Sequence, residues 1–185
     1  MKRLLLFCVA LSYAMGTYLS AQNLVRVQDE RTGLYGYKYE NSDKWVVKPK
    51  YYEAAREFHD GLAYVIRENG YYKDKRGRIL TGRKEAGYIN EKGKLCIPLK
   101  FYWAYNFVDG IALVKIWDSK SLTGWKFGFI DTSGKYVIPP IYDYAESFDY
   151  SGTAKVKWYK NGVMYSSRVK RNGEHGAVES ERVNY

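Results

Sequence analysis

The sequence predicts an all-β fold built from antiparallel hairpins, and three observations carry this prediction. Aromatic residues make up 17% of the 185 residues, including 20 Tyr, and flat rings pack well on a pleated sheet. An apolar share of 46% is enough for the packed core of a single domain. One pattern of residues also recurs three times along the chain, which is typical of a repeat architecture.

The three copies share fixed internal spacings. Each copy has a glycine followed by an aromatic residue, then a proline, an alanine and a phenylalanine. The residues in question are Gly36, Pro49, Ala55 and Phe58, then Gly87, Pro98, Ala104 and Phe107, then Gly128, Pro139, Ala145 and Phe148. The alanine follows the proline by 6 positions and the phenylalanine by 9 in every copy. We therefore expect units at about 33–65, 87–115 and 124–157, a degenerate fourth at 158–185, and the three phenylalanines as equivalent core residues.

Each copy is interpreted as a hairpin followed by a crossover to a third strand. The hairpin turn of the third copy contains Gly134, which can take the left-handed conformation that a short loop needs. The first copy has no such glycine, so its turn should be longer or looser. The proline after each second strand lacks an N–H and should end that strand. Such units stack openly or close like a propeller, and the sequence leaves both arrangements open.

This pattern resembles the WG-repeat family, also called KWG repeats. The third copy matches best, with Gly124-Trp125-Lys126-Phe127-Gly128-Phe129-Ile130-Asp131 followed by Gly134-Lys135-Tyr136-Val137-Ile138-Pro139-Pro140-Ile141-Tyr142-Asp143. The Trp-Gly pair that names the family is absent, because Tyr35 and Ala86 precede the glycines of the first two copies. The resemblance covers residues 33–157. It implies an exported or interaction-type array of β repeats without a common set of catalytic residues.

The N-terminus has the layout of a secretory signal at residues 1–21. Two basic residues precede the apolar run 4–11, which is too short to span a bilayer, and small residues follow up to Ala21. We expect cleavage after Ala21, with a cut after Gly16 as the alternative. Cys8 lies inside the apolar run, which argues against a lipoprotein. The protein should therefore be exported to the periplasm, the cell surface or the extracellular space.

The histidines and cysteines do not predict a catalytic, cofactor or metal site. His59 and His175 lie too far apart in the sequence to suggest a ligand set, and His59 matches a plain turn position of the repeat. Cys96 aligns with Val47 and Val137, so we expect a buried thiol that acts as a small apolar side chain. After cleavage Cys96 would be the only cysteine, which excludes an internal disulfide.

The acidic residues are the other candidates for chemistry. Asp60 and Asp109 precede turn glycines, while Asp131 and Asp143 lie at strand ends. Backbone hydrogen bonding at turns explains an aspartate at all four positions. We therefore expect a protein that is not an enzyme. A glycan hydrolase is a weaker alternative, since it needs only two carboxylates brought together in one groove.

Residues 66–86 interrupt the repeat and form the predicted binding surface. They hold seven basic and three acidic residues, and two apolar pairs flank the basic centre as in a hairpin. Insertions on repeat scaffolds often serve binding, and cations beside rings can hold an anion. The residues we select are Tyr71, Tyr72, Lys73, Lys75, Arg76 and Arg78. The alternative interpretation is a solvated hairpin whose charge only aids solubility.

Together these features predict a non-catalytic binding or scaffolding module of the bacterial cell envelope. Its partner would be another envelope protein, or alternatively an anionic polymer attracted by a net charge of +10. Binding of a polymer should weaken steeply with salt. Export separates the chain from nucleic acid, so none is expected. Strands broken by proline and a charged hairpin argue against a lipid-facing wall, so we do not expect an integral membrane protein.

Overall fold

The computed structural model describes residues 23–51, 53–55, 57–69, 72–73, 79–80, 83–121 and 123–182. The expected signal at 1–21 lies outside this part of the chain. The strands are β1 (Leu24–Gln28), β2 (Tyr35–Tyr39), β3 (Trp45–Tyr51), β4 (Glu53–Ala54), β5 (Leu62–Asn69), β6 (Tyr72–Lys73), β7 (Ile79–Leu80), β8 (Arg83–Asn90), β9 (Leu95–Phe101), β10 (Trp103–Val108), β11 (Ile111–Trp117), β12 (Trp125–Asp131), β13 (Tyr136–Tyr142), β14 (Tyr144–Ala145), β15 (Thr153–Lys160), β16 (Val163–Lys170) and β17 (Glu179–Arg182).

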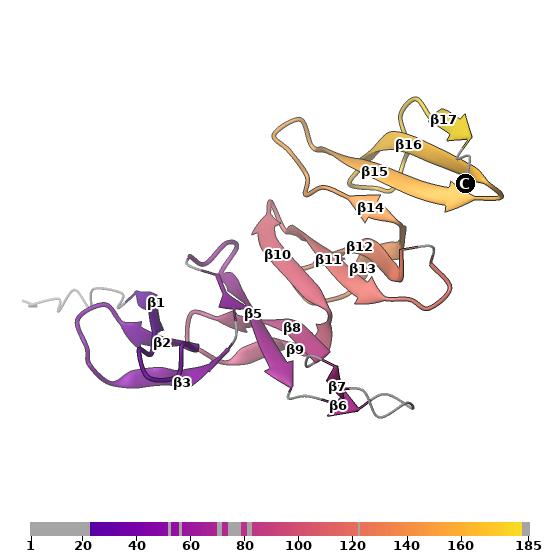
Figure 1. Cartoon of the computed structure of the whole chain (residues 1–185). Helices are drawn as coiled ribbons and strands as arrows, with labels where there is room; N and C mark the ends of the chain where they lie inside the picture. Colours follow the sequence, from indigo (N-terminus) through magenta and orange to yellow (C-terminus); the bar gives the residue numbers. More distant parts are fainter. Residues whose placement is uncertain are drawn as a thin grey trace, which may run out of the picture.

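The strands form four successive antiparallel sheets and one short hairpin. The sheets have the orders β1-β2-β3, β4-β5-β8-β9, β10-β11-β12-β13 and β14-β15-β16-β17, and β6 pairs with β7. This confirms the prediction of an all-β array of hairpins. The sheets follow one another from β1 to β17, which lie at opposite ends of the molecule (Figure 1). The array is therefore an open stack, which decides between the two arrangements that the sequence left open.

Each of the last three sheets combines strands from two successive copies of the repeat. The third strand of the first copy, β5, pairs with the first strand of the second copy, β8, from Leu62↔Asn90 to Asn69↔Arg83. β11 pairs with β12, and β15 with β16, in the same way. The crossovers contribute the edge strands β4, β10 and β14, which the sequence did not predict. Backbone hydrogen bonds as well as side-chain packing therefore join neighbouring copies.

The prolines do not end their strands, contrary to the sequence prediction. In the second hairpin the ladder steps from Tyr88↔Ile97 to Ala86↔Phe101, so two residues of β8 face four residues of β9. Pro98 lies in the unpaired part of this bulge, where a missing N–H removes no ladder hydrogen bond. The strand can therefore continue through the proline to Phe101.

The bulge explains the glycine that every copy carries. A Cβ on Gly87 would lie 2.4 Å from the carbonyl oxygen of Ile97, and one on Gly36 would lie 2.4 Å from that of Val47. Gly128 makes a similar close approach to its partner strand. Real Cβ atoms do not approach a backbone oxygen so closely, so a glycine is required where the bulged strand crosses.

The first hairpin is one residue longer than the second and third. Tyr37 pairs with Val47, whereas Tyr88 pairs with Ile97, one position closer along the chain. Gly93 closes the second turn with a φ of +73°, and the first turn has no glycine. This confirms the longer turn that the missing glycine predicted.

The pairing of Tyr37 with Val47 shows that the sequence alignment of the first copy with the other two is wrong by one position. Pro49 follows the paired valine by two positions, so it matches Leu99 and not Pro98. Consequently Ala54, not Ala55, pairs with a valine of the third strand as the alanines of the other copies do. The constant spacing between proline and alanine was therefore a coincidence in the first copy.

Three hydrophobic clusters lie between the successive sheets, and one aromatic contact recurs in each. Ring centroids lie 5.7 Å apart for Tyr37 and Phe58, 4.8 Å for Tyr88 and Phe107, and 4.8 Å for Phe129 and Phe148. Phe107 and Phe148 are buried as predicted, while Phe58 is only partly buried. Such pairs stabilise the interfaces beyond the area that they bury.

Polar contacts fix the geometry of these interfaces. The hydroxyl of Tyr37 donates to the carbonyl of Ala55, and that of Tyr88 to the carbonyl of Tyr105, both at 2.8 Å. Burial raises the pKa of both tyrosines well above the usual value, so both hydroxyls stay neutral donors. Each buried hydroxyl thus satisfies a backbone carbonyl of the next sheet.

The last hairpin repeats the turn geometry of the earlier ones. Lys170 N donates to Glu174 O at 2.8 Å and Gly173 N to Lys170 O at 2.9 Å, as the corresponding atoms do in the turn that contains Gly134. An isolated β-bridge then joins Val169 to His175. This bridge matches the ladder pair of Ile130 and Tyr136 in the third hairpin. The fourth copy is thus degenerate in sequence but keeps the turn.

The outer face of the last sheet is polar. Arg168 occupies the position that Tyr88 and Phe129 hold in the inner sheets, one residue before the buried aliphatic of the hairpin. Its Nε donates to Thr153 Oγ1 at 2.7 Å, and its guanidinium pairs with Asp149. Repeat arrays need a polar outer face at their ends. The outer face at Arg168 therefore lacks the aromatic ring on which the next sheet packs in the inner interfaces.

Candidate binding surface

The predicted binding hairpin lies at the connection between β5 and β8. Its short strands pair as Tyr72↔Leu80 and Lys73↔Ile79, so a hairpin is present in the insertion. Tyr71, Lys75, Arg76 and Arg78 lie outside the described residues, as do the side chains of Tyr72 and Lys73. The binding role of these six residues remains a prediction.

This connection is one of three that leave the array on the same side. The connections between β5 and β8, between β11 and β12, and between β15 and β16 follow one another along one edge (Figure 1). They are equivalent by position, because each joins the third strand of one copy to the hairpin of the next. Loops on one face of a repeat scaffold are where binding residues usually lie.

An aromatic–lysine cluster lies at the middle connection. We define it by Tyr102, Lys115, Trp117 and Trp125. Trp117 pairs with Trp125 across the β11–β12 ladder, and their rings meet edge-on with centroids 4.8 Å apart. The Tyr102 ring lies 4.1 Å from the Trp125 ring. Strands β11 and β12 thus bring these rings together with Tyr102, the residue before β10.

Trp117 is the exposed member of the cluster, with 59% of its surface open to solvent. A Cβ added to Gly124 would lie 2.7 Å from the Trp117 ring, so the indole rests closely against the loop backbone. Gly124 has a φ of +74° and carries no side chain that would push the ring away. The indole is therefore supported by the protein and still available to a partner.

Lys115 lies among the rings of the cluster. Its ammonium is 4.5 Å from the Trp125 ring centroid and 5.6 Å from that of Tyr102. Burial lowers the pKa of Lys115, because the charged form loses hydration there. Attraction to the ring faces offsets part of that loss. The lysine thus adds positive charge beneath an aromatic surface.

The base of the insertion contacts the strand that follows Tyr102. The Lys84 ammonium lies 5.2 Å from the ring centroid of Trp103, the first residue of β10. Lys84 belongs to β8 and to the insertion, and it lies opposite Glu68 of β5 in the ladder. The insertion therefore lies against the strand that begins directly after Tyr102 of the cluster.

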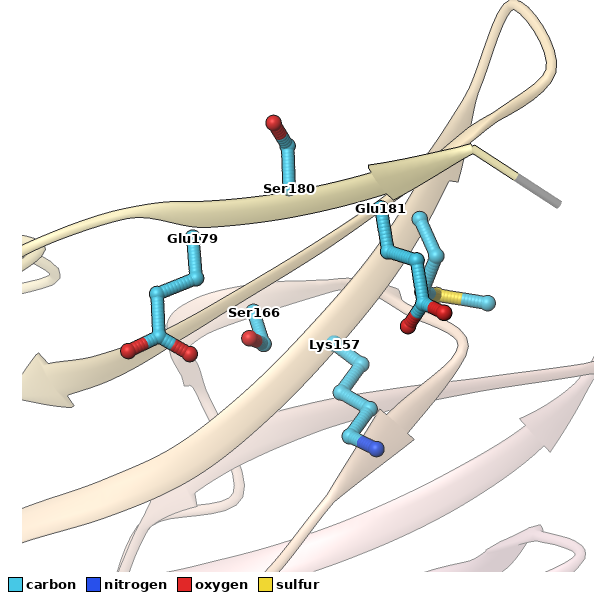
Figure 2. Close-up of a pocket in the computed structure, with 6 residues that line it drawn as sticks. Lys157, Ser166, Glu179, Ser180 and Glu181 are labelled. Carbon is cyan, nitrogen blue, oxygen red and sulfur yellow. The ribbon is translucent and has the colours of Figure 1, made fainter.

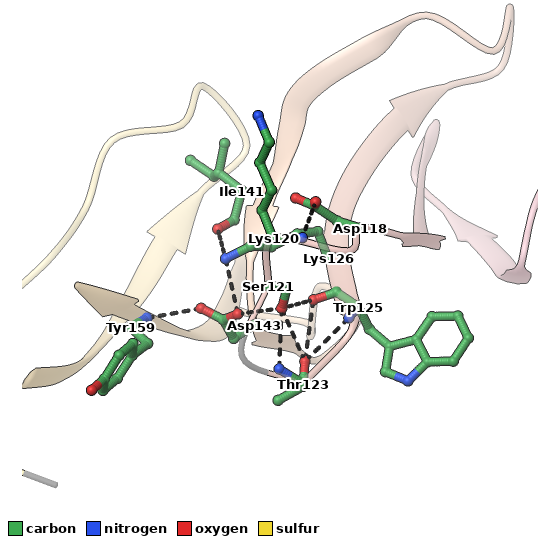
Figure 3. Close-up of polar contacts among 9 residues, drawn as sticks. All are labelled: Asp118, Lys120, Ser121, Thr123, Trp125, Lys126, Ile141, Asp143 and Tyr159. Carbon is green, nitrogen blue, oxygen red and sulfur yellow. Dashed lines mark hydrogen bonds and ion pairs between the residues drawn. The ribbon is translucent and has the colours of Figure 1, made fainter. Parts of the chain in front are cut away.

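A polar network around Asp143 holds the loop that carries the cluster (Figure 3). Asp143 Oδ1 accepts from Lys126 Nζ at 2.9 Å and from Ser121 Oγ at 2.8 Å, and Oδ2 accepts from Tyr159 N at 2.8 Å. Ser121 Oγ also lies 2.7 Å from Trp125 O, and its single proton is shared between these two acceptors. One buried carboxylate thus ties the β11–β12 loop to β15 of the following sheet.

Asp143 is ionised in this network. Burial opposes the charged form, but hydrogen bonds from Lys126, Tyr159 N and Ser121 outweigh it and hold the pKa of Asp143 below its usual value. Only 4% of the Asp143 side chain is exposed, against 17% for Lys126. The pair is therefore a well-satisfied ion pair close to the surface, and its role is to position the loop.

The four aspartates expected to serve turns divide into two groups. Asp131 behaves as predicted and accepts from Ser133 N and Lys135 N within its own turn. Asp60, Asp109 and Asp143 instead reach other parts of the array. Asp60 Oδ2 accepts from Gly110 N at 2.7 Å, and Arg171 donates to Asp109 Oδ2 at 2.7 Å. Turn chemistry alone did not predict these contacts between copies.

The prediction of a buried Cys96 was wrong. Cys96 is exposed, because the inward position of its strand belongs to Ile97, which pairs with Tyr88. Its structural counterparts Val46 and Val137 are exposed as well, and the one-position error in the first copy put the buried Val47 in place of Val46. His59 is a turn residue as expected, and its backbone exchanges hydrogen bonds with Leu62. Its side chain is partly buried rather than fully exposed.

A shallow groove lies on the outer face of the last sheet (Figure 2). It is lined by Lys157, Met164, Ser166, Glu179, Ser180 and Glu181. Glu179 and Glu181 project from the same strand, β17. A glycan hydrolase needs two carboxylates on either side of the scissile bond, and this arrangement along one strand does not supply them.

The described residues contain no group of three His, Cys, Asp or Glu side chains that could hold a metal ion. Within the same residues, no helix is long and apolar enough to cross a membrane.

The sequence reasoning missed the aromatic–lysine cluster. A signal was present, because Trp103, Trp117 and Trp125 are three of the five tryptophans in the chain and fall within one short stretch. The spacing alone did not show that strand pairing brings the rings of Trp117 and Trp125 to Tyr102 and Lys115.

Comparison with known families agrees with this architecture. The WG containing repeat matches the chain at residues 39–72, 87–120 and 127–162. The chain therefore belongs to the WG-repeat family, as its spacing and its glycine–aromatic pairs indicated. No curated protein and no solved structure matches it.

Proposed function

We propose that this chain is an exported, non-catalytic module of the bacterial cell envelope that binds another protein through the aromatic–lysine cluster. The observation that carries the proposal is Trp117, a well-supported indole that is 59% exposed. Tryptophans of this kind often provide most of the binding energy of a protein interface. The neighbouring rings of Trp125 and Tyr102 extend the apolar surface.

The repeat architecture supports this proposal. An open stack of sheets displays three equivalent connections along one edge, and two of them carry the aromatic–lysine cluster and the predicted hairpin. The layout of residues 1–21 supports export, since a charged start, a short apolar run and small residues follow in order. Sequencing the N-terminus of the exported protein tests this part, with Gln22 as the expected first residue.

A second candidate function is the binding of an anionic polymer of the envelope. The net charge of +10 and the basic residues of the insertion favour it. The two candidates differ in their response to salt. Contacts with a charged polymer weaken steeply as salt rises, whereas an interface anchored by aromatic rings is much less sensitive.

The test is a pull-down from envelope extract at low and high salt with residues 22–185 as bait. One variant carries Trp117→Ala, and its control carries Tyr150→Ala, which removes a fully exposed ring outside the cluster. A third bait replaces Lys73, Lys75, Arg76 and Arg78 with Ser.

We expect one defined protein to bind at both salt concentrations, and to be lost with Trp117→Ala but not with Tyr150→Ala. Capture of acidic polymer that disappears with salt or with the serine variant would replace this proposal with the second candidate. Equal capture by all baits would contradict both binding sites.

A further inference from the structure

Among the described residues, the first sheet has one strand fewer than each of the other three. The second, third and fourth sheets each have four strands, and their edge strands β4, β10 and β14 pair with β5, β11 and β15. The first sheet has the order β1-β2-β3. Within the described part of the chain, no strand pairs with the outer edge of β1.

β1 occupies the place that β5 holds in the next sheet. Val27 pairs with Gly36 as Val65 pairs with Gly87, and Arg26 pairs with Tyr37 as Tyr64 pairs with Tyr88. The position outside β1 therefore corresponds to that of β4, β10 and β14. In each of those strands an alanine lies opposite the valine: Ala54 opposite Val65, Ala104 opposite Val114, and Ala145 opposite Val156.

The equivalent strands show which backbone groups of β1 need a partner. Tyr64 O accepts from Ala55 N, and Lys155 O accepts from Glu146 N, both at 2.9 Å. Both carbonyls correspond to that of Arg26. Lys115 O and Lys157 O accept from the edge-strand side in the same way and correspond to the carbonyl of Gln28. These two carbonyls of β1 thus face the side on which no described strand pairs with it.

The export proposed above would remove the chain segment that could fill this position. In the other sheets the alanine precedes its valine by ten or eleven positions. Counting back from Val27 by the same distance reaches residues 16–17, upstream of the proposed cleavage after Ala21. The mature chain would begin at Gln22, too close to β1 to supply the strand.

We infer that the outer edge of β1 accepts an extended strand from a partner protein, with a small residue opposite Val27. This inference rests on the proposed cleavage of the signal. β1 reads Leu24-Val25-Arg26-Val27-Gln28, with one charge and no proline, so nothing in it blocks edge pairing. Addition of a strand to an open sheet edge is a common way of binding an extended peptide.

A second copy of this chain fits the edge less well. The symmetric antiparallel register that pairs all five residues of β1 places Arg26 opposite Arg26 of the other copy, and like charges directly opposite destabilise a ladder. In the monomer the Arg26 guanidinium instead donates to Ala54 O at 2.8 Å and pairs with Glu53. A partner strand avoids that repulsion.

A peptide from this chain provides the probe. Residues 142–149 contain β14, carry Ala145 at the required position and have three acidic side chains that suit a basic protein. The control peptide carries Ala145→Arg, since a long side chain cannot replace the buried alanine. Hydrogen exchange of residues 22–185 is then measured with each peptide in excess.

The expected result is at least tenfold slower exchange of the Arg26 amide with the natural peptide and no change with the control peptide. Slower exchange confined to β15 would show that the peptide replaces β14, and unchanged exchange at Arg26 would overturn the inference. A mature chain that sediments as a dimer, with the Arg26 amide protected before peptide is added, would also overturn it in favour of a second copy.

N-terminal sequencing of the protein from cells separates this inference from the export proposal. If N-terminal sequencing shows that the signal is retained in the cell, the export proposal fails. Binding of the peptide to residues 22–185 would still show that the β1 edge accepts a strand.

Discussion

The two faces of the last described sheet differ in their side chains, and the difference shows what a sheet interface of this array requires. On the inner face, Val156 and Val169 are fully buried against the third sheet. On the outer face, the same strands carry Lys155 and Arg168, which are exposed. The side chains of both faces project from one and the same β15–β16 ladder. Continuation of the array is therefore decided by side chains and not by the strand framework.

The largest expected difference between the inner interfaces and the outer face concerns the aromatic contacts. Phe107→Ala removes a ring that is 1% exposed and packs against Tyr88, so unfolding should become easier by about 3–5 kcal/mol. Lys155→Ala on the outer face should change the free energy by less than about 0.5 kcal/mol. Urea denaturation measures both. Similar losses would contradict the distinction between the two faces.

A smaller loss of stability should follow from adding one methyl group at Gly87, where the bulged strand β9 passes over β8. Gly87→Ala places a Cβ 2.4 Å from the carbonyl oxygen of Ile97 and should cost about 3 kcal/mol of stability. The last hairpin lacks the proline bulge, and Ser167 already has a side chain at the matching position. Ser167→Ala should therefore cost at most about 1 kcal/mol in the same denaturation experiment. A harmless Gly87→Ala would show that the crossing can relax.

The Asp143 network should give a smaller, pH-dependent effect. Asp143→Asn leaves the Lys126 ammonium without its counter-charge and should cost about 2 kcal/mol at neutral pH. Because the folded state lowers the pKa of Asp143, its contribution is present above the ordinary aspartate pKa of about 4 and is lost as the pH falls through the folded value. The difference between wild type and Asp143→Asn should therefore shrink in acid. A difference independent of pH would contradict this assignment.

The smallest change in stability, within about 1 kcal/mol, is expected for Arg168→Phe on the outer face. This variant restores the aromatic that Tyr88 and Phe129 provide in the inner sheets and removes the contact with Asp149. The exposed face then becomes apolar, so the chain should associate at increasing concentration in sedimentation experiments. Arg168→Lys serves as the control and should remain monomeric. A monomeric Arg168→Phe would show that other outer-face residues suffice to stop the array.

Much of the fold was predictable because the repeat is local in sequence. The turn glycines, the hairpins and the third strands follow from spacing alone. The alignment of the first copy failed because two differences compensate. Pro49 lies one position later in its strand than Pro98 does, and one extra residue lies between Tyr51 and Phe58, so the distance from Pro49 to Phe58 equals that in the other copies. Only strand pairing separates such a coincidence from a true match.

The candidate surface was less predictable because it depends on pairing between strands. Lys115 and Trp125 lie on neighbouring strands, and Tyr102 is brought to them by the crossover that follows β9. The predicted hairpin drew attention first because its charge is local in sequence. A surface made by distant residues leaves no such local signal.

The sharing of each sheet between two copies of the repeat has a consequence for fragments of the chain. A cut in the connection between β5 and β8 leaves β4 and β5 on one piece and β8 and β9 on the other. Neither piece can complete the second sheet alone, yet the β5–β8 ladder and the surrounding cluster remain available to both. The two pieces should recognise each other and reassemble, so this protein offers a natural site for fragment complementation.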